Sequence, residues 1–165
     1  MGSEAFRVWR ARALLTLGFW VPLAYGRGEE DKARLFEMLH EKLLNTPSPK
    51  YFKYFLLLLH RAYERVPAVA TLLPPEEEGR AWLEESKKVP PWKDAALTLL
   101  TELQWKHGSR AAQHFLEELY ARIGKARTPS EALRNIAEVV EKVKERFPEL
   151  IETSEIERIL RGGQA

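Results

Sequence analysis

The chain has 165 residues, the length of one domain, and its 45% hydrophobic and 30% charged residues are typical of a globular protein rather than a disordered one. A formal net charge of +2 is too small to indicate binding to nucleic acid or to a membrane, so any such function must depend on where the charges lie. The sequence has no cysteine, which excludes disulfides and thiolate chemistry and is consistent with a reducing compartment, so we expect a cytoplasmic protein. Abundant Glu, Lys, Arg and Pro together with scarce Asn, Gln and Met also predict a thermophilic source.

Ten prolines separate Leu-, Ala- and Glu-rich blocks of helical length, and almost no segment has the alternating pattern of a strand. Proline fixes φ, lacks an N–H group and disfavours the helical conformation of the preceding residue, so prolines mark where helices begin and end. The pattern predicts an all-α protein. We expect a single helical domain over residues 1–165, a compact bundle of seven or eight helices with short connections punctuated by proline and glycine.

The first predicted helix covers residues 3–21, and its apolar residues are not confined to one face. The large apolar side chains around it are Phe6, Val8, Trp9, Leu14, Leu15, Leu17 and Trp20. Such a helix is expected to be enclosed by the domain or by a partner. The apolar segment 11–25 is shorter than the about 20 residues that span a bilayer, and acidic residues rather than a cleavage site follow it, so we expect neither a signal peptide nor a membrane helix.

Capping residues and prolines predict the later helices in chain order. A second helix begins after Gly28 and ends before Pro47, and a third runs from Pro49 to Val66 with Ser48 as its N-cap. Further helices are predicted around Trp82, from Pro91 to Gly108, from Ser109 to Gly124, from Thr128 to Phe147, and from Ser154.

The sequence contains no pattern typical of catalysis or metal binding. It has no glycine-rich phosphate loop, and its serines mostly lie where helices begin. Glu37 and His40 match half of a di-iron site, but none of the other histidines has a glutamate three residues before it, so His40 is interpreted as a boundary residue. His107 and His114 lie seven residues apart across a helix break, which is not the spacing of a helical zinc site. We therefore expect no catalytic residue, no metal and no cofactor, and a helical enzyme whose site is assembled from scattered acids and histidines is the least favoured of the three functional alternatives.

The residue pattern of one predicted helix does favour ligand binding. At about 100° per residue, the cations and one tyrosine of the third helix gather on the side opposite its apolar residues. These residues are Lys50, Lys53, Tyr54, Arg61 and Arg65. Four cations with an interleaved tyrosine can contact phosphates and stack on a base, the arrangement used by surfaces that bind single-stranded nucleic acid. The alternative is an ordinary solvated helix face.

The leading hypothesis is a non-catalytic subunit that contacts the backbone of single-stranded RNA or DNA within a larger assembly. Small helical proteins that are basic on one face and lack catalytic residues include the small subunits of CRISPR effector complexes, so the chain is similar to them in type, although no motif carries the likeness. The competing hypothesis is a protein-interaction or regulatory module that binds a protein partner or a second copy. Trp105, which lies off the apolar stripe of its helix, is its candidate partner-binding residue.

Overall fold

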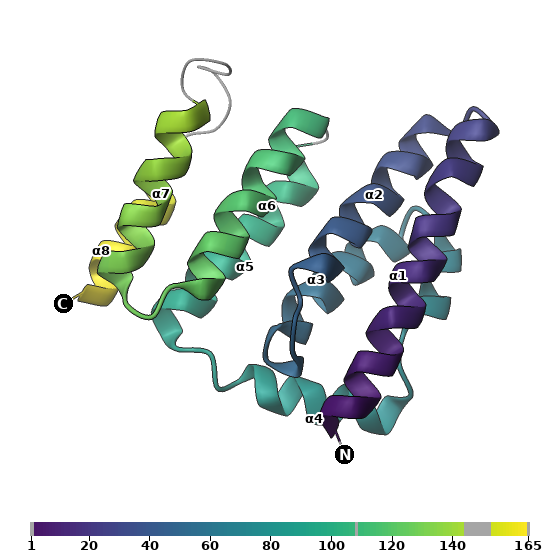
Figure 1. Ribbon diagram of the computed structural model, residues 1–165, viewed down its shortest axis with the longest axis horizontal. Coiled ribbons are helices and arrows are strands. Elements are labelled where there is room, and N and C mark those ends of the chain that lie inside the picture. The colour runs from purple at the N-terminus through teal and green to yellow at the C-terminus, as the bar shows by residue number, and fades with distance from the viewer. Residues whose placement is uncertain (1, 108, 144–152, 165) are drawn as a thin grey trace. The chain divides into compact units, whose positions relative to one another are not determined.

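The computed structural model describes residues 2–107, 109–143 and 153–164. Throughout these ranges the regular structure is helical, in eight α-helices and two short 3₁₀ helices, and none of these residues lies in a strand (Figure 1). The predicted all-α class is confirmed.

Packing between helices divides the chain into two compact units, residues 1–88 and residues 89–165. The helices of each unit pack mainly on one another. The expectation that the whole chain forms a single domain stays a prediction.

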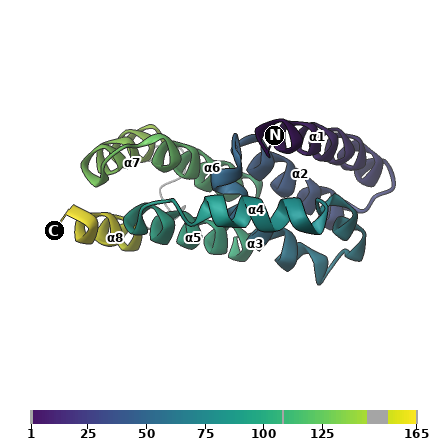
Figure 2. The same ribbon diagram turned by 90° about the horizontal axis from the view of Figure 1, so that it is seen from below.

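The first unit begins with a helical hairpin, because α1 and α2 are joined by a short turn and pack along each other (Figure 1). Viewed from below, α4 passes in front of α3, and it contacts α3, η1 and α1 (Figure 2). The elements of this unit are α1 (Gly2–Gly26), α2 (Glu30–Leu44), η1 (Pro49–Tyr51), α3 (Phe52–Tyr63), η2 (Pro67–Leu72) and α4 (Glu76–Ser86).

A cluster of aromatic rings holds α1, α3 and α4 together. Trp82 of α4 is 1% exposed and meets Phe6 edge-on, with ring centroids 5.1 Å apart and an interplanar angle of 86°. Trp9 contacts the same indole and also packs edge-on against Phe52 and Phe55 of α3. Large aromatic side chains dominate core energetics, and edge-to-face pairs add about 0.5–1.5 kcal/mol beyond their area burial. These contacts fix α3 and α4, the two helices that carry the candidate site.

The prediction that α1 ends at Val21 is wrong, because α1 continues to Gly26 with Pro22 inside it. Pro22 lies on the exposed side, where water can satisfy the carbonyl that loses its hydrogen bond. Gly28 terminates the helix two residues further on, because its φ of +74° is a conformation that favours glycine and does not continue an α-helix. Glu29 N–H bonds the carbonyl of Ala24 and Gly28 N–H that of Tyr25, which is the Schellman pattern of a helix C-terminus.

The described chain does not enclose α1 on all sides, so of the two expected ways of covering this helix, by the domain or by a partner, the domain provides only part. One side is buried against the unit, where Phe6, Ala13 and Leu17 are at most 3% exposed. The opposite side leaves large apolar residues in solvent, with Leu15 75% and Phe19 68% exposed. Enclosure by a partner stays a prediction.

The second unit is a bundle in which each of four helices packs on two others: α5 and α7 both contact α6 and α8. Ser109 caps α6 by accepting the N–H of Ala112, and Thr128 accepts the N–H of Glu131 at the start of α7, as the capping patterns predict. The predicted continuation of α7 to Phe147 lies outside the described residues. The elements of this unit are α5 (Pro91–Lys106), α6 (Arg110–Lys125), α7 (Pro129–Val143) and α8 (Ser154–Gln164).

Among the described residues, no helix combines the length and apolar character needed to cross a membrane.

Candidate nucleic-acid interface

The predicted basic stripe begins in η1, not in an α-helix. Lys50 lies in this 3₁₀ turn and Lys53 in the first turn of α3, and both side chains are half-buried. The Lys53 ammonium lies 5.7 Å from the centroid of the Tyr54 ring, within cation–π distance. The first two cations of the stripe are therefore held close to the protein surface rather than extended into solvent.

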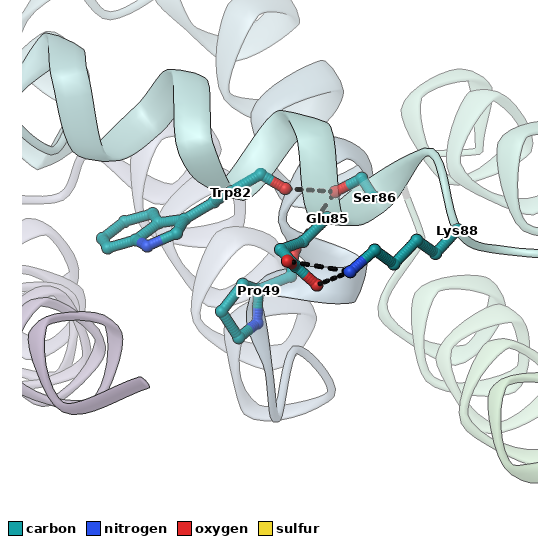
Figure 3. A network of polar contacts seen from close by, with 5 residues as sticks. All are labelled: Pro49, Trp82, Glu85, Ser86 and Lys88. Atoms are coloured by element: carbon teal, nitrogen blue, oxygen red, sulfur yellow. Dashed lines mark hydrogen bonds and ion pairs between the residues drawn. The ribbon is translucent and has the colours of Figure 1, made fainter. Parts of the chain in front are cut away.

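Ser86, the last residue of α4, joins this end of the stripe to α4. Its hydroxyl is buried and accepts the backbone N–H of Lys53 at 3.3 Å. It also contacts the carbonyl oxygens of Pro49 at 3.1 Å and Trp82 at 3.0 Å (Figure 3). One side chain thus joins the C-terminus of α4 to the backbone of both η1 and α3. The two segments are 33 to 37 residues apart in sequence.

This junction brings two further cations to the stripe. Lys87 and Lys88 directly follow Ser86, whose hydroxyl contacts the backbone on either side of Lys50, at Pro49 and at Lys53. We call Lys50, Lys53, Lys87 and Lys88 the lysine cluster. Lys87 is paired with Glu84 at 2.8 Å, and all four side chains of this pair and the next are at least half exposed. Lys88 is paired with Glu85 at 3.1 Å (Figure 3). Sequence reasoning missed Lys87 and Lys88 because the glutamates before them mark an acidic stretch. The sequence signal that could have identified them is the pair of consecutive lysines at the end of a helix.

Tyr54 does not lie on the exposed face, so that part of the prediction is wrong. Its side chain is 0% exposed, and it belongs to the buried side of α3 together with Phe55 and Leu58. A ring in this position cannot stack on a base. The aromatic residue that α3 does expose is Tyr63, at 51%.

Arg61 and Arg65 are exposed at the other end of α3, with Glu64 between them. Because an α-helix rises about 1.5 Å per residue, the eight residues from Lys53 to Arg61 separate the two groups by about 12 Å. The cations therefore form two groups, the lysine cluster near the start of α3 and two arginines near its end, where Arg65 lies two residues beyond the helix.

Trp105 lies on α5 in the second unit and is half-buried. It has an interaction partner, so it is not the freely exposed anchor that its place off the apolar stripe suggested. The partner-binding role of Trp105 stays a prediction.

Glu37 and His40, which match half of a di-iron site in sequence, have structural roles instead. Glu37 accepts a hydrogen bond from the hydroxyl of Tyr25, which ties α2 to α1. His40 is half-buried beside Gly18, and this burial lowers the pKa of its imidazole below the usual value. The described residues contain no group of three or more acidic or histidine side chains that could hold a metal ion.

No protein-family model, no curated protein and no solved structure matches the chain. The likeness in type to CRISPR small subunits thus has no support from a relative, and a functional argument must start from the surfaces of the molecule itself.

Proposed function

We propose that the protein is a non-catalytic subunit that contacts the phosphate backbone of single-stranded RNA or DNA within a larger assembly, through the lysine cluster, Arg61 of α3 and Arg65 just beyond the end of this helix. The observation that supports it is the junction at Ser86, which holds the end of α4, just before Lys87 and Lys88, against the backbone of the segment that carries Lys50 and Lys53. Glu84 and Glu85 pair with Lys87 and Lys88 at this junction.

The two ion pairs do not prevent phosphate binding. Exposed pairs of this kind contribute about 0–1 kcal/mol, so a lysine can exchange its carboxylate for a phosphate at little cost. Each phosphate that is neutralised releases condensed counterions, which supplies the free energy of binding and makes the affinity depend on salt. Because Tyr54 is buried, the proposal depends on phosphate contacts and not on base stacking.

The test replaces the lysine cluster by glutamine and measures binding of a fluorescent oligothymidylate at low ionic strength. Wild type should bind with a logarithmic salt slope of about −0.7 per phosphate contacted. The quadruple variant should bind much more weakly and with a shallower slope. Circular dichroism checks that it is folded.

A matched control removes four exposed lysines from elsewhere: Lys32, Lys106, Lys125 and Lys142. It changes the net charge by the same amount and should keep most of the binding. An equal loss in both variants would show attraction to net charge alone, and wild type without any salt-sensitive binding would also contradict the proposal.

A further inference from the structure

Two acidic residues belong to the segment that carries the exposed lysines of the lysine cluster. Glu84 and Glu85 come directly before Ser86, and the two lysines come directly after it. The ammonium of Lys87 donates to the carboxylate of Glu84 at 2.8 Å. The ammonium of Lys88 lies 3.1 Å from each of the two carboxylate oxygens of Glu85 (Figure 3). Both lysines are therefore occupied by carboxylates from their own segment.

Helix stability does not account for the position of these two acids. The partial negative charge at the C-terminus of a helix makes an acidic side chain unfavourable in the last turn, where Glu84 and Glu85 lie. An exposed ion pair three residues apart stabilises a helix by no more than that position costs. The first turn of α4, where the helix dipole favours acids, already contains Glu76, Glu77 and Glu78.

The other side of the Ser86 junction carries no acid of this kind. Neither η1 nor the first turn of α3, both of which the structure describes completely, contains an acidic residue. A phosphate at the lysine cluster thus meets the carboxylates of Glu84 and Glu85 at the end of α4.

These carboxylates compete with a phosphate for the same ammonium groups. A phosphate that binds Lys87 or Lys88 must displace the carboxylate or share the ammonium with it, and a carboxylate that stays nearby repels it. Breaking an exposed ion pair changes an equilibrium constant by up to about fivefold. Two such pairs lower the affinity measurably and still allow binding.

We propose that Glu84 and Glu85 are a built-in competitor of the bound strand, which occupies Lys87 and Lys88 in the free protein and holds the affinity of the lysine cluster below that of four unpaired lysines. This inference rests on the proposed function and adds to it the regulation of its site. The competing groups are the carboxylates, so their replacement by neutral side chains of the same size releases the lysines.

The test measures binding of fluorescent oligothymidylate to the full chain at low ionic strength. The double variant Glu84→Gln/Glu85→Gln should bind about three- to tenfold more tightly than wild type. The matched control is Glu29→Gln/Glu30→Gln, which also changes two consecutive glutamates, paired with Lys32 at 2.7 Å and with Arg34 at 3.0 Å. It changes the net charge by the same amount and should alter the affinity less than about twofold.

Thermal melting separates competition from a structural role. Glu84→Gln/Glu85→Gln should melt no lower than wild type, because it removes two negative charges from the C-terminal turn of a helix. A melting temperature that falls more than in the control, or a variant that fails to fold, would show that the two pairs serve stability, and the proposal would be wrong.

The gain in affinity must also depend on the lysines. Added to the glutamine variant of the lysine cluster, Glu84→Gln/Glu85→Gln should give no tighter binding, and a gain that persists there would contradict the proposal. If the lysine cluster is needed for binding but Glu84→Gln/Glu85→Gln binds no more tightly than the control, this inference alone is wrong. If wild type and every variant lack salt-sensitive binding, the proposed function is wrong and the inference falls with it.

Discussion

Trp9 and Leu72 are joined by a hydrogen bond of 2.7 Å from the indole Nε1 to the carbonyl oxygen, across 63 residues of sequence. The contact is buried, and it fixes α1 to the end of η2, two elements that line a groove of about 700 Å³ together with Glu78 of α4. A single donor thus contributes both to the stability of the first unit and to the shape of its surface.

Replacing Trp9 by phenylalanine removes this donor and keeps an aromatic ring. Because the Leu72 carbonyl is left buried without its partner, we expect the free energy of unfolding to fall by about 1–3 kcal/mol, measured by urea denaturation. Trp20→Phe is the control, since Trp20 packs against Phe36 and its indole N–H makes no hydrogen bond in the described structure. A loss no larger than that of Trp20→Phe would mean that the bond contributes little.

Ser86→Ala should destabilise the first unit because the buried hydroxyl contacts three backbone groups at the junction of α4 with η1 and α3. The expected cost is about 1–3 kcal/mol by urea denaturation. Ser48→Ala is a matched control, because Ser48 precedes η1 without a capping hydrogen bond from its side chain. Ser86→Ala should also weaken oligothymidylate binding, since the lysine cluster is no longer held together.

The local sequence predicted where several helices begin, because proline and capping residues act within one turn. Pro49, Pro91 and Pro129 each begin a helical element, as expected. Pro22 did not end α1, because an exposed helix side tolerates the missing hydrogen bond. No local pattern could place Lys87 beside Lys50, since that proximity depends on a contact of Ser86 with a residue 37 positions away.

The error at Tyr54 has a geometric cause. The helical projection that placed Tyr54 on the same side as Lys50 assumed 100° per residue from Lys50 onward. Lys50 instead lies in a 3₁₀ turn, which has about three residues per turn. In addition, α2, η2 and α4 all pack on α3, so its buried side is wider than that of a helix with one covered face.

Two tyrosines of α3 test this placement directly. Tyr54→Ala should lower the free energy of unfolding by about 3–5 kcal/mol, because it removes a fully buried aromatic ring. Tyr63→Ala should cost much less, since half of that side chain is already in solvent. Comparable thermal shifts for the two variants would show that the burial of Tyr54 is wrong.

Gly18→Ala should stabilise the protein by about 0.5–1 kcal/mol, the usual difference between glycine and alanine inside a helix. A Cβ at Gly18 would lie 3.9 Å from Nε2 of His40, which is ordinary van der Waals contact, so the methyl group fits without displacing its neighbours. Thermal melting measures the effect. A lower melting temperature would mean that α1 and α2 pack more tightly than this distance indicates.

His40 should make stability depend on pH, because burial lowers the pKa of its imidazole in the folded state. In the unfolded chain a histidine has a pKa of about 6.5, so as the pH falls below that value the unfolded state binds the proton first. Stability therefore rises with pH in this range. The contribution of His40 is fully present above a pH of about 6.5 and is progressively lost in more acidic solution.

Urea denaturation at several pH values between about 7.5 and 5 should show that His40→Gln loses less stability on acidification than wild type does. His60→Gln, at an exposed position of α3, controls for the removal of one imidazole. Equal acid sensitivity of wild type and His40→Gln would show that other groups determine the pH dependence.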